Sequence, residues 1–160
     1  MTQADGSLWA EFGFPCVAMG WLGPQSVFST GPVAPAFFGR LMELLIDPWQ
    51  PAVFASFDSC DLCQFTNGPA HVSFGESRVG VGERIVFVPS ETGELFVAPS
   101  LIAHYIDAHH YQPPARFVSA VTKCPPMRSM AYLRALLACG VKPSRFRSFG
   151  GPDAESEAGG

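Results

Sequence analysis

The chain has 160 residues, of which 48% are hydrophobic and 15% charged, and its net charge is −4. This composition excludes an intrinsically disordered chain and fits a single globular domain with tails. No apolar run is long enough to span a membrane and no basic segment precedes an apolar one at the N-terminus, so we expect a soluble, cytoplasmic protein.

The first part of the chain is expected to be extended. Residues 1–14 have the character of a flexible tail. Residues 15–35 are rich in glycine and proline and include Trp21, which predicts an extended N-terminal arm anchored by large side chains. A helix should begin near Pro35 and end at Asp47, because apolar residues recur at helical spacing between them.

A thiol turn and a small sheet should follow this helix. Cys60 and Cys63 occupy a tight turn near the start of a core that we place at about residues 56–121. Strands are predicted where β-branched and aromatic residues are bounded by turn residues, over residues 71–74, 84–88 and 95–98. The last two strands should form a hairpin through residues 91–94, so we expect a small antiparallel sheet.

Helices should make up most of the rest of the domain. One is predicted from Ser100 to His109, a second after the proline pair at residues 113–114, and a third over residues 127–139. The expected fold class is therefore α+β, with a small antiparallel sheet and a treble-clef-like zinc site flanked by helices and by the extended N-terminal arm.

Charge is distributed unevenly along this single domain, which should span residues 15–147 and be followed by a flexible acidic tail at residues 148–160. Residues 1–107 carry eleven acidic residues and three arginines, whereas residues 108–152 carry seven basic residues and no acidic one. This asymmetry indicates a basic surface that meets an acidic partner, nucleic acid or the acidic part of the same chain. The residues that we assign to partner binding are Trp21, Arg116, Arg128, Arg134, Arg145 and Arg147.

Cys60, Cys63, His104 and His109 have the residue types of a structural zinc site. Zinc takes thiolate and imidazole ligands in tetrahedral geometry, and a C-x-x-C turn can present two sulfurs while a helix end presents the nitrogens. The order of thiol turn, hairpin and helix is that of treble-clef-like zinc modules. Residues five apart on an ideal helix point about 140° away from each other, so we expect the helix to loosen near His109.

Other interpretations of these residues stay open. His110 competes with His109 as the fourth ligand, and His71 is a fallback. The thiols could instead be buried while the histidines cap a helix end. A redox disulfide is disfavoured because acidic residues flank the thiols, and a catalytic zinc is disfavoured because four ligands leave no open position. A cysteine nucleophile paired with a histidine is conceivable.

Five segments of the sequence stand out together, namely residues 20–23, 31–33, 60–63, 98–109 and 111–121. In these segments the sequence resembles a family of small, uncharacterised bacterial proteins. The resemblance covers roughly residues 20–121 and implies no established activity. In that family the place of His110 is usually a small residue, which favours His109 as the ligand. The helix over residues 127–139 lies outside the shared region.

The preferred interpretation is a zinc-stabilised, non-enzymatic module that binds another protein, as a regulator or accessory subunit. The sequence contains none of the phosphate-loop, nucleophile-elbow or dinucleotide-binding motifs that indicate an enzyme. One alternative is a nucleic-acid-binding protein that uses the basic C-terminal segment against phosphates. The other is a zinc or thiol enzyme.

Overall fold

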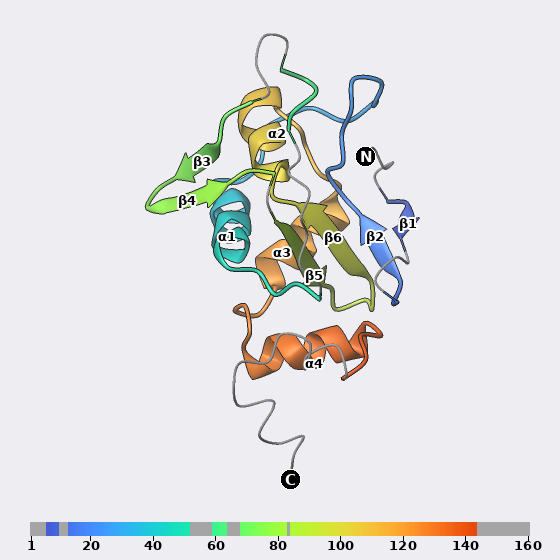
Figure 1. Ribbon diagram of the computed structural model, residues 1–160. Helices are drawn as coiled ribbons and strands as arrows, with labels where there is room; N and C mark the ends of the chain where they lie inside the picture. Colours follow the sequence, from blue (N-terminus) through green and yellow to red (C-terminus); the bar gives the residue numbers. More distant parts are fainter. Residues whose placement is uncertain (1–5, 10–12, 52–58, 64–67, 83, 144–160) are drawn as a thin grey trace.

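The computed structural model describes residues 6–9, 13–51, 59–63, 68–82 and 84–143. Its strands are β1 (Leu8–Trp9), β2 (Cys16–Ala18), β3 (His71–Phe74), β4 (Ser77–Gly80), β5 (Ile85–Pro89) and β6 (Leu95–Pro99). Its helices are α1 (Pro35–Ile46), α2 (Ile102–His109), α3 (Ala115–Lys123) and α4 (Met130–Ala138). The strands and helices form the expected α+β arrangement (Figure 1).

Within the described residues, the central sheet has the strand order β1-β2-β6-β5. β5 and β6 form the predicted antiparallel hairpin, in which Val88 lies opposite Phe96. The central sheet differs from the predicted small antiparallel sheet, because β2 runs parallel to β6 with Val17 opposite Phe96. All three residues of β2 are buried, so this strand lacks the alternation of apolar and polar residues that identifies a half-exposed strand. The surrounding glycines and prolines favoured an extended arm instead.

β3 does not join the central sheet, contrary to the prediction. It pairs with β4 in a separate antiparallel hairpin, where Val72 lies opposite Val79. Both valines are buried whereas His71 and Arg78 are exposed, so the hairpin has one apolar and one polar face. The sequence did not predict β4, because Ser77–Gly80 contains a single β-branched residue and too little apolar alternation.

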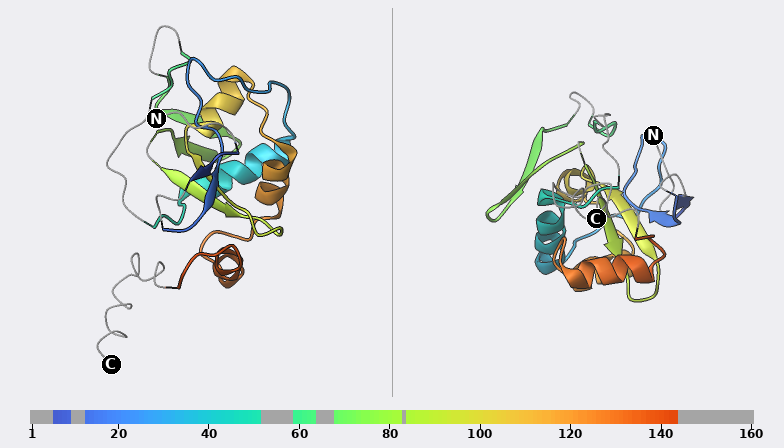
Figure 2. Two further views of the ribbon diagram at one scale, coloured as in Figure 1. Left: turned by 90° about the vertical axis from the view of Figure 1, so that its right-hand side faces the viewer. Right: turned by 60° about the horizontal axis from the view of Figure 1, so that its bottom comes forward.

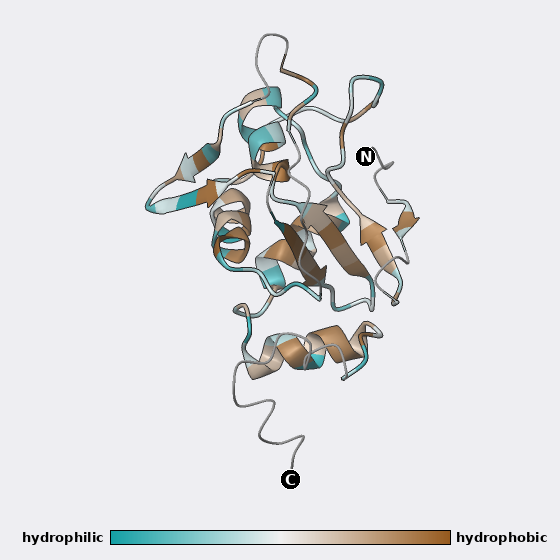
Figure 3. Cartoon of the chain, in the orientation of Figure 1, coloured by the Kyte–Doolittle hydropathy of each residue, from teal (hydrophilic) through white to brown (hydrophobic). Residues whose placement is uncertain are grey.

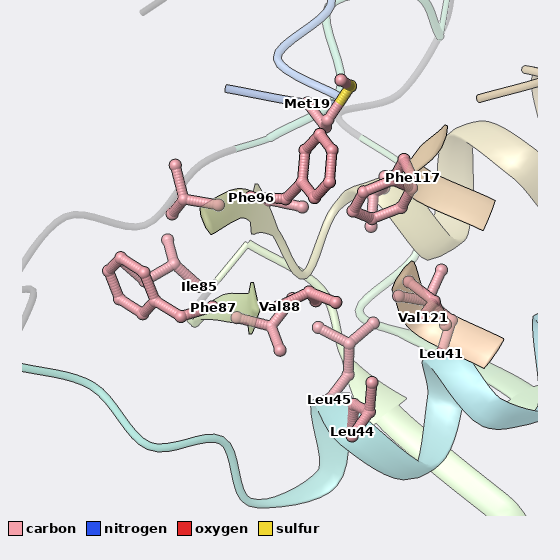
Figure 4. Close-up of a cluster of buried hydrophobic side chains, with 14 of the residues drawn as sticks. Met19, Leu41, Leu44, Leu45, Ile85, Phe87, Val88, Phe96, Phe117 and Val121 are labelled. Carbon is pink, nitrogen blue, oxygen red and sulfur yellow. The ribbon is translucent and has the colours of Figure 1, made fainter. Parts of the chain in front are cut away.

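Helices α1 and α3 cover one face of the central sheet (Figures 1 and 2). Phe96 points toward them, and its ring centroid lies 5.6 Å from that of Phe117 on α3. Val88 lies toward Leu41 and Leu45 of α1 (Figure 4). These side chains are fully buried, and each contributes about 1.5–3 kcal/mol of apolar transfer free energy to the core.

The opposite face of the sheet is closed by segments without regular structure. Phe87, which neighbours Val88 on β5, points to this face (Figure 4). Its ring centroid lies 5.7 Å from that of Phe14 and 5.5 Å from that of Trp49. The residues before β2 and after α1 therefore complete the core, and β5 and β6 are buried on both sides.

The predicted helices are present, and their ends follow the expected signals. Pro35 is the first residue of α1 and Asp47 is its C-cap. At the start of α4, the side chain of Ser129 accepts a hydrogen bond of 3.1 Å from the backbone N–H of Tyr132. α2 and α4 lie at opposite ends of the central sheet (Figure 1), whose strands β5 and β6 are strongly apolar (Figure 3).

The ends of the chain differ in part from the prediction. Residues 1–14, expected as a flexible tail, include β1, which pairs with β2 through Leu8 opposite Val17. The acidic tail predicted at residues 148–160 lies outside the described residues. Among the helices that the structure describes, none has the length and apolarity needed to cross a membrane.

Candidate metal centre

Four side chains from two distant segments meet at one end of the central sheet. Cys60 and Cys63 lie in a turn, and His104 and His109 lie on α2, which directly follows β6. Because β6 is held in the middle of the sheet, it fixes the position at which α2 begins. We call these four residues the Cys–His cluster.

α2 is itself anchored in the core. Ile102 and Ala103 are fully buried at its start. One turn further, the hydroxyl of Tyr105 donates a hydrogen bond of 3.1 Å to the backbone carbonyl of Leu22. This contact links α2 to the N-terminal arm (residues 15–35). The helix that carries both imidazoles is therefore held in place by the sheet and by the arm.

The ligand atoms of the Cys–His cluster all lie within 4.8 Å of one another. The Sγ atom of Cys63 is 3.3 Å from Nε2 of His104 and 3.6 Å from Nε2 of His109. The Sγ atom of Cys60 is 3.4 Å from Nε2 of His109. Zinc bonds of about 2.3 Å to sulfur and about 2.0–2.1 Å to nitrogen would place these atoms about 3.5 Å apart at the tetrahedral angle. The cluster is therefore positioned to hold a metal ion.

The cluster lies half inside the protein. Cys60 and His104 are buried, whereas Cys63 and His109 are partly exposed. Burial raises the pKa of the Cys60 thiol. Burial also lowers the pKa of His104, and the neighbouring His109 adds to this effect. At neutral pH His104 is therefore neutral and has a nitrogen lone pair free for a metal, whereas the thiol of Cys60 loses a proton when a metal binds.

The expected loosening at the end of α2 is present. His110 has a left-handed conformation, with φ of 56°, and its N–H bonds to the carbonyl of Tyr105 five residues earlier. The N–H of Tyr111 bonds to the same carbonyl at 3.1 Å. The chain thus leaves the helix directly after His109, and the ring centroids of His104 and His109 lie 5.0 Å apart. His110 is exposed and stays outside the cluster.

Gly68 forms part of the wall of the cluster, a role that the sequence analysis missed. Its φ is +91°, and a Cβ atom at this position would lie 3.1 Å from the Cβ of Cys60 and 3.5 Å from Nε2 of His104. The proximity of Gly68 to the ligands depends on tertiary contacts that no local pattern contains.

His71 and Trp21 do not take the roles considered for them. His71, the fallback ligand, lies on the β3–β4 hairpin, where its Nδ1 atom is 3.4 Å from Nη2 of Arg78. Trp21 was assigned to partner binding, a role that requires an exposed side chain. The structure corrects this assignment: Trp21 is buried and packs edge-on against Trp9, with ring centroids 4.8 Å apart.

Two of the basic residues assigned to partner binding pair with acidic residues of the same chain. Arg116 forms an ion pair of 2.6 Å with Glu94, and Arg128 lies 3.6 Å from a carboxylate oxygen of Asp47. Arg134 is exposed on α4. Arg145 and Arg147 lie outside the described residues. The charge asymmetry of the sequence is therefore compensated in part inside the molecule.

Residues 2–122 match the protein family described as Domain of unknown function (DUF7919). The chain belongs to this family. The DUF7919 region contains all four residues of the Cys–His cluster, whereas α4 lies beyond it, as the sequence analysis expected for this helix. No curated protein and no solved structure matches the chain. The chemistry of the site, and not a characterised relative, must therefore guide the assignment of function.

Proposed function

We propose that the DUF7919 region is a zinc-stabilised module in which Cys60, Cys63, His104 and His109 hold one structural Zn²⁺ ion. The observation that carries this proposal is the convergence of four ligand atoms to within 4.8 Å, with sulfur–nitrogen separations of 3.3–3.6 Å. Thiolate and imidazole donors in this ratio suit Zn²⁺ better than the oxygen-seeking ions Mg²⁺ and Ca²⁺.

The same geometry supports a treble-clef-like arrangement. A C-x-x-C turn, β-hairpins and a helix with two further ligands follow one another along the chain. The zinc ion would bridge the turn to α2, two segments that lie about forty residues apart in sequence. The free energy of metal binding would then contribute directly to folding.

A role in binding another protein, as an accessory or regulatory subunit of a bacterial cell, is our preferred function for this module. Four protein ligands complete a tetrahedral shell and leave no position for a substrate or for water, which argues against a zinc enzyme. The pairing of Arg116 and Arg128 with carboxylates argues against an extended basic surface for nucleic acid. Val27, whose side chain is fully exposed, lines a mainly apolar hollow of about 770 Å³ together with Phe28 and Pro32, and such a surface suits a protein contact.

The first experiment measures zinc per chain by elemental analysis of the untagged protein, the Cys63→Ser variant and the His104→Ala variant. We expect one zinc ion per chain in the parent and less than one-tenth of that in both variants, with a lower melting temperature. The matched control is Cys139→Ser, because the Cys139 thiol contacts the carbonyls of Ser90 and Glu94 far from the cluster. Full zinc content in Cys63→Ser would contradict the assigned ligands.

Cobalt substitution separates the structural site from an enzymatic one. A closed site with two sulfur and two nitrogen ligands gives the intense visible absorption of tetrahedral Co²⁺, unchanged by added small anions. A weak, five-coordinate spectrum that responds to azide or cyanide would instead indicate an open coordination position. That result would favour the zinc enzyme over the binding module.

A further inference from the structure

A second cluster of polar side chains lies away from the metal centre, between the end of α1 and the β3–β4 hairpin. It lines a hollow of about 480 Å³, which we call the arginine hollow. The residues that line it are Leu45, Ile46, His71, Arg78, Val79, Gly80 and Arg84. Its ionisable side chains are thus two arginines and one histidine, and no carboxylate is among the lining residues that the structure describes.

The concentration of arginine in this hollow is unexpected from the charge of the surrounding sequence. Residues 1–107 contain eleven acidic residues and only three arginines. Arg78 and Arg84 are two of those three, and they come together from a strand and from the segment before β5. The third, Arg40, forms an ion pair of 2.8 Å with Glu43.

Neither arginine of the hollow forms an ion pair with a carboxylate of the described residues. Asp47, the acidic residue that directly follows α1, lies beside Arg128 instead. Arg84 donates a hydrogen bond from Nη1 to the carbonyl of Ile46 at the end of α1. Because a guanidinium group has five N–H donors, this bond fixes its position and leaves most of its donors available.

His71 and Arg78 add further N–H donors to those of Arg84. Nη2 of Arg78 lies 3.4 Å from Nδ1 of His71. Since the guanidinium can only donate, Nδ1 is the acceptor in this contact and Nε2 is the ring nitrogen that carries a proton. The ring therefore has an N–H donor of its own, and all three of these donor side chains line the hollow.

We propose that the arginine hollow binds the phosphate group of a small phosphorylated molecule. Two guanidinium groups and an imidazole N–H match a dianion with three free oxygens better than a carboxylate with two, and arginine recognises phosphate in a bidentate manner. A volume of about 480 Å³ accommodates the phosphate and part of the molecule to which it is attached. The site lies within the DUF7919 region, and none of its lining residues belongs to the Cys–His cluster.

An NMR titration of the full, zinc-loaded chain with inorganic phosphate tests this site. At constant ionic strength we expect saturable shifts of the side-chain Nε–H signals of Arg78 and Arg84, with no response to chloride. The exposed side chain of Arg78 allows Arg78→Gln to fold, and this variant should bind phosphate about tenfold more weakly or worse. The matched control is Arg134→Gln, an exposed arginine on α4, which should leave the affinity unchanged.

Three results would overturn the proposal. One is a response that increases linearly with phosphate and equals the response to chloride. The second is an equal affinity in Arg78→Gln and the parent, and the third is a set of shifts confined to residues near the Cys–His cluster. A second titration with glycerol 3-phosphate distinguishes the source of the phosphate: tighter binding than inorganic phosphate assigns a phosphate ester, and equal binding assigns the free ion.

Discussion

Gly68 has no side chain and lies close to the residues of the metal centre. Its positive φ is a conformation that glycine adopts at no steric cost, and the nearest side chain is that of Cys60. A methyl group here would press against the turn that presents the thiols. The missing side chain of Gly68 therefore leaves room for the cluster.

Gly68→Ala should weaken zinc binding about tenfold, because the Cβ atom, 3.1 Å from that of Cys60, would displace the thiol turn. Competition with a chromophoric chelator measures the change in affinity. Gly93→Ala is the matched control, since Gly93 has a φ of +90° and no atom within 4 Å of an added Cβ. The control carries the same backbone strain without the contact, so equal zinc affinities in both variants would refute the steric explanation.

The histidines show how one residue beyond a helix affects the site. The left-handed conformation of His110 ends α2 directly after His109. Asparagine and glycine adopt this conformation more readily than histidine. His109 thus provides a nitrogen to the cluster, whereas His110 reverses the direction of the backbone.

At the scale of elements, α4 is an addition to the DUF7919 region. It lies at the end of the sheet opposite α2 (Figure 1). Tyr132 attaches it, because this side chain is fully buried and its hydroxyl donates a hydrogen bond of 2.6 Å to the carbonyl of Phe87 on β5. Cys139, the C-cap of α4, lies against the β5–β6 turn through Ser90.

Tyr132→Phe should lower the free energy of unfolding by about 1–2 kcal/mol, because the variant keeps the buried ring but loses the hydrogen bond from the hydroxyl to the carbonyl of Phe87. Urea unfolding of the zinc-loaded protein measures this change. The zinc content should stay at the value of the parent, since α4 and the cluster lie at opposite ends of the sheet (Figure 1). Unchanged stability would show that this hydrogen bond contributes nothing to attaching α4.

At the scale of the whole molecule, cysteine thiols outside the metal centre are buried in separate parts of the core. Burial raises the pKa of Cys16 on β2 from an ordinary value of 9.0 to about 12, and it raises the pKa of Cys124 after α3 to about 12 as well. The thiol of Cys16 also points its proton at the carbonyl of Phe14, at 3.7 Å. In the folded state both thiols therefore stay protonated at pH values where the unfolded chain ionises.

Stability should consequently fall in alkaline solution. Below pH 9 each thiol is protonated in both states, whereas between pH 9 and about 12 only the unfolded state loses the proton. The free energy of unfolding then falls by about 1.4 kcal/mol per pH unit for each thiol. Cys16→Ala should reduce the loss of stability between pH 8 and pH 10 by about 1.4 kcal/mol in urea unfolding. An equal loss in the parent and the variant would contradict the raised pKa.

Local signals predicted much of the architecture. The helix over Pro35–Ile46 was recognisable because an apolar stripe is bounded by a proline and by Asp47–Pro48. The β5–β6 hairpin was recognisable from β-branched residues around a turn with Gly93. The residues of the Cys–His cluster were predicted from the order of a C-x-x-C turn, a hairpin and a helix with two histidines, although their convergence required a loosened helix end.

The amino-acid sequence by itself determined the helices, the hairpin and the identity of the candidate ligands, because residue spacing and turn chemistry act over a few positions. Only the tertiary structure decided that β2 runs parallel to β6, that β3 pairs with β4, and that Gly68 borders the cluster. It also decided that the arginines at positions 78 and 84 share one hollow. These features depend on contacts between segments that are brought together by burial of the common core. Such contacts produce no periodic pattern in the sequence.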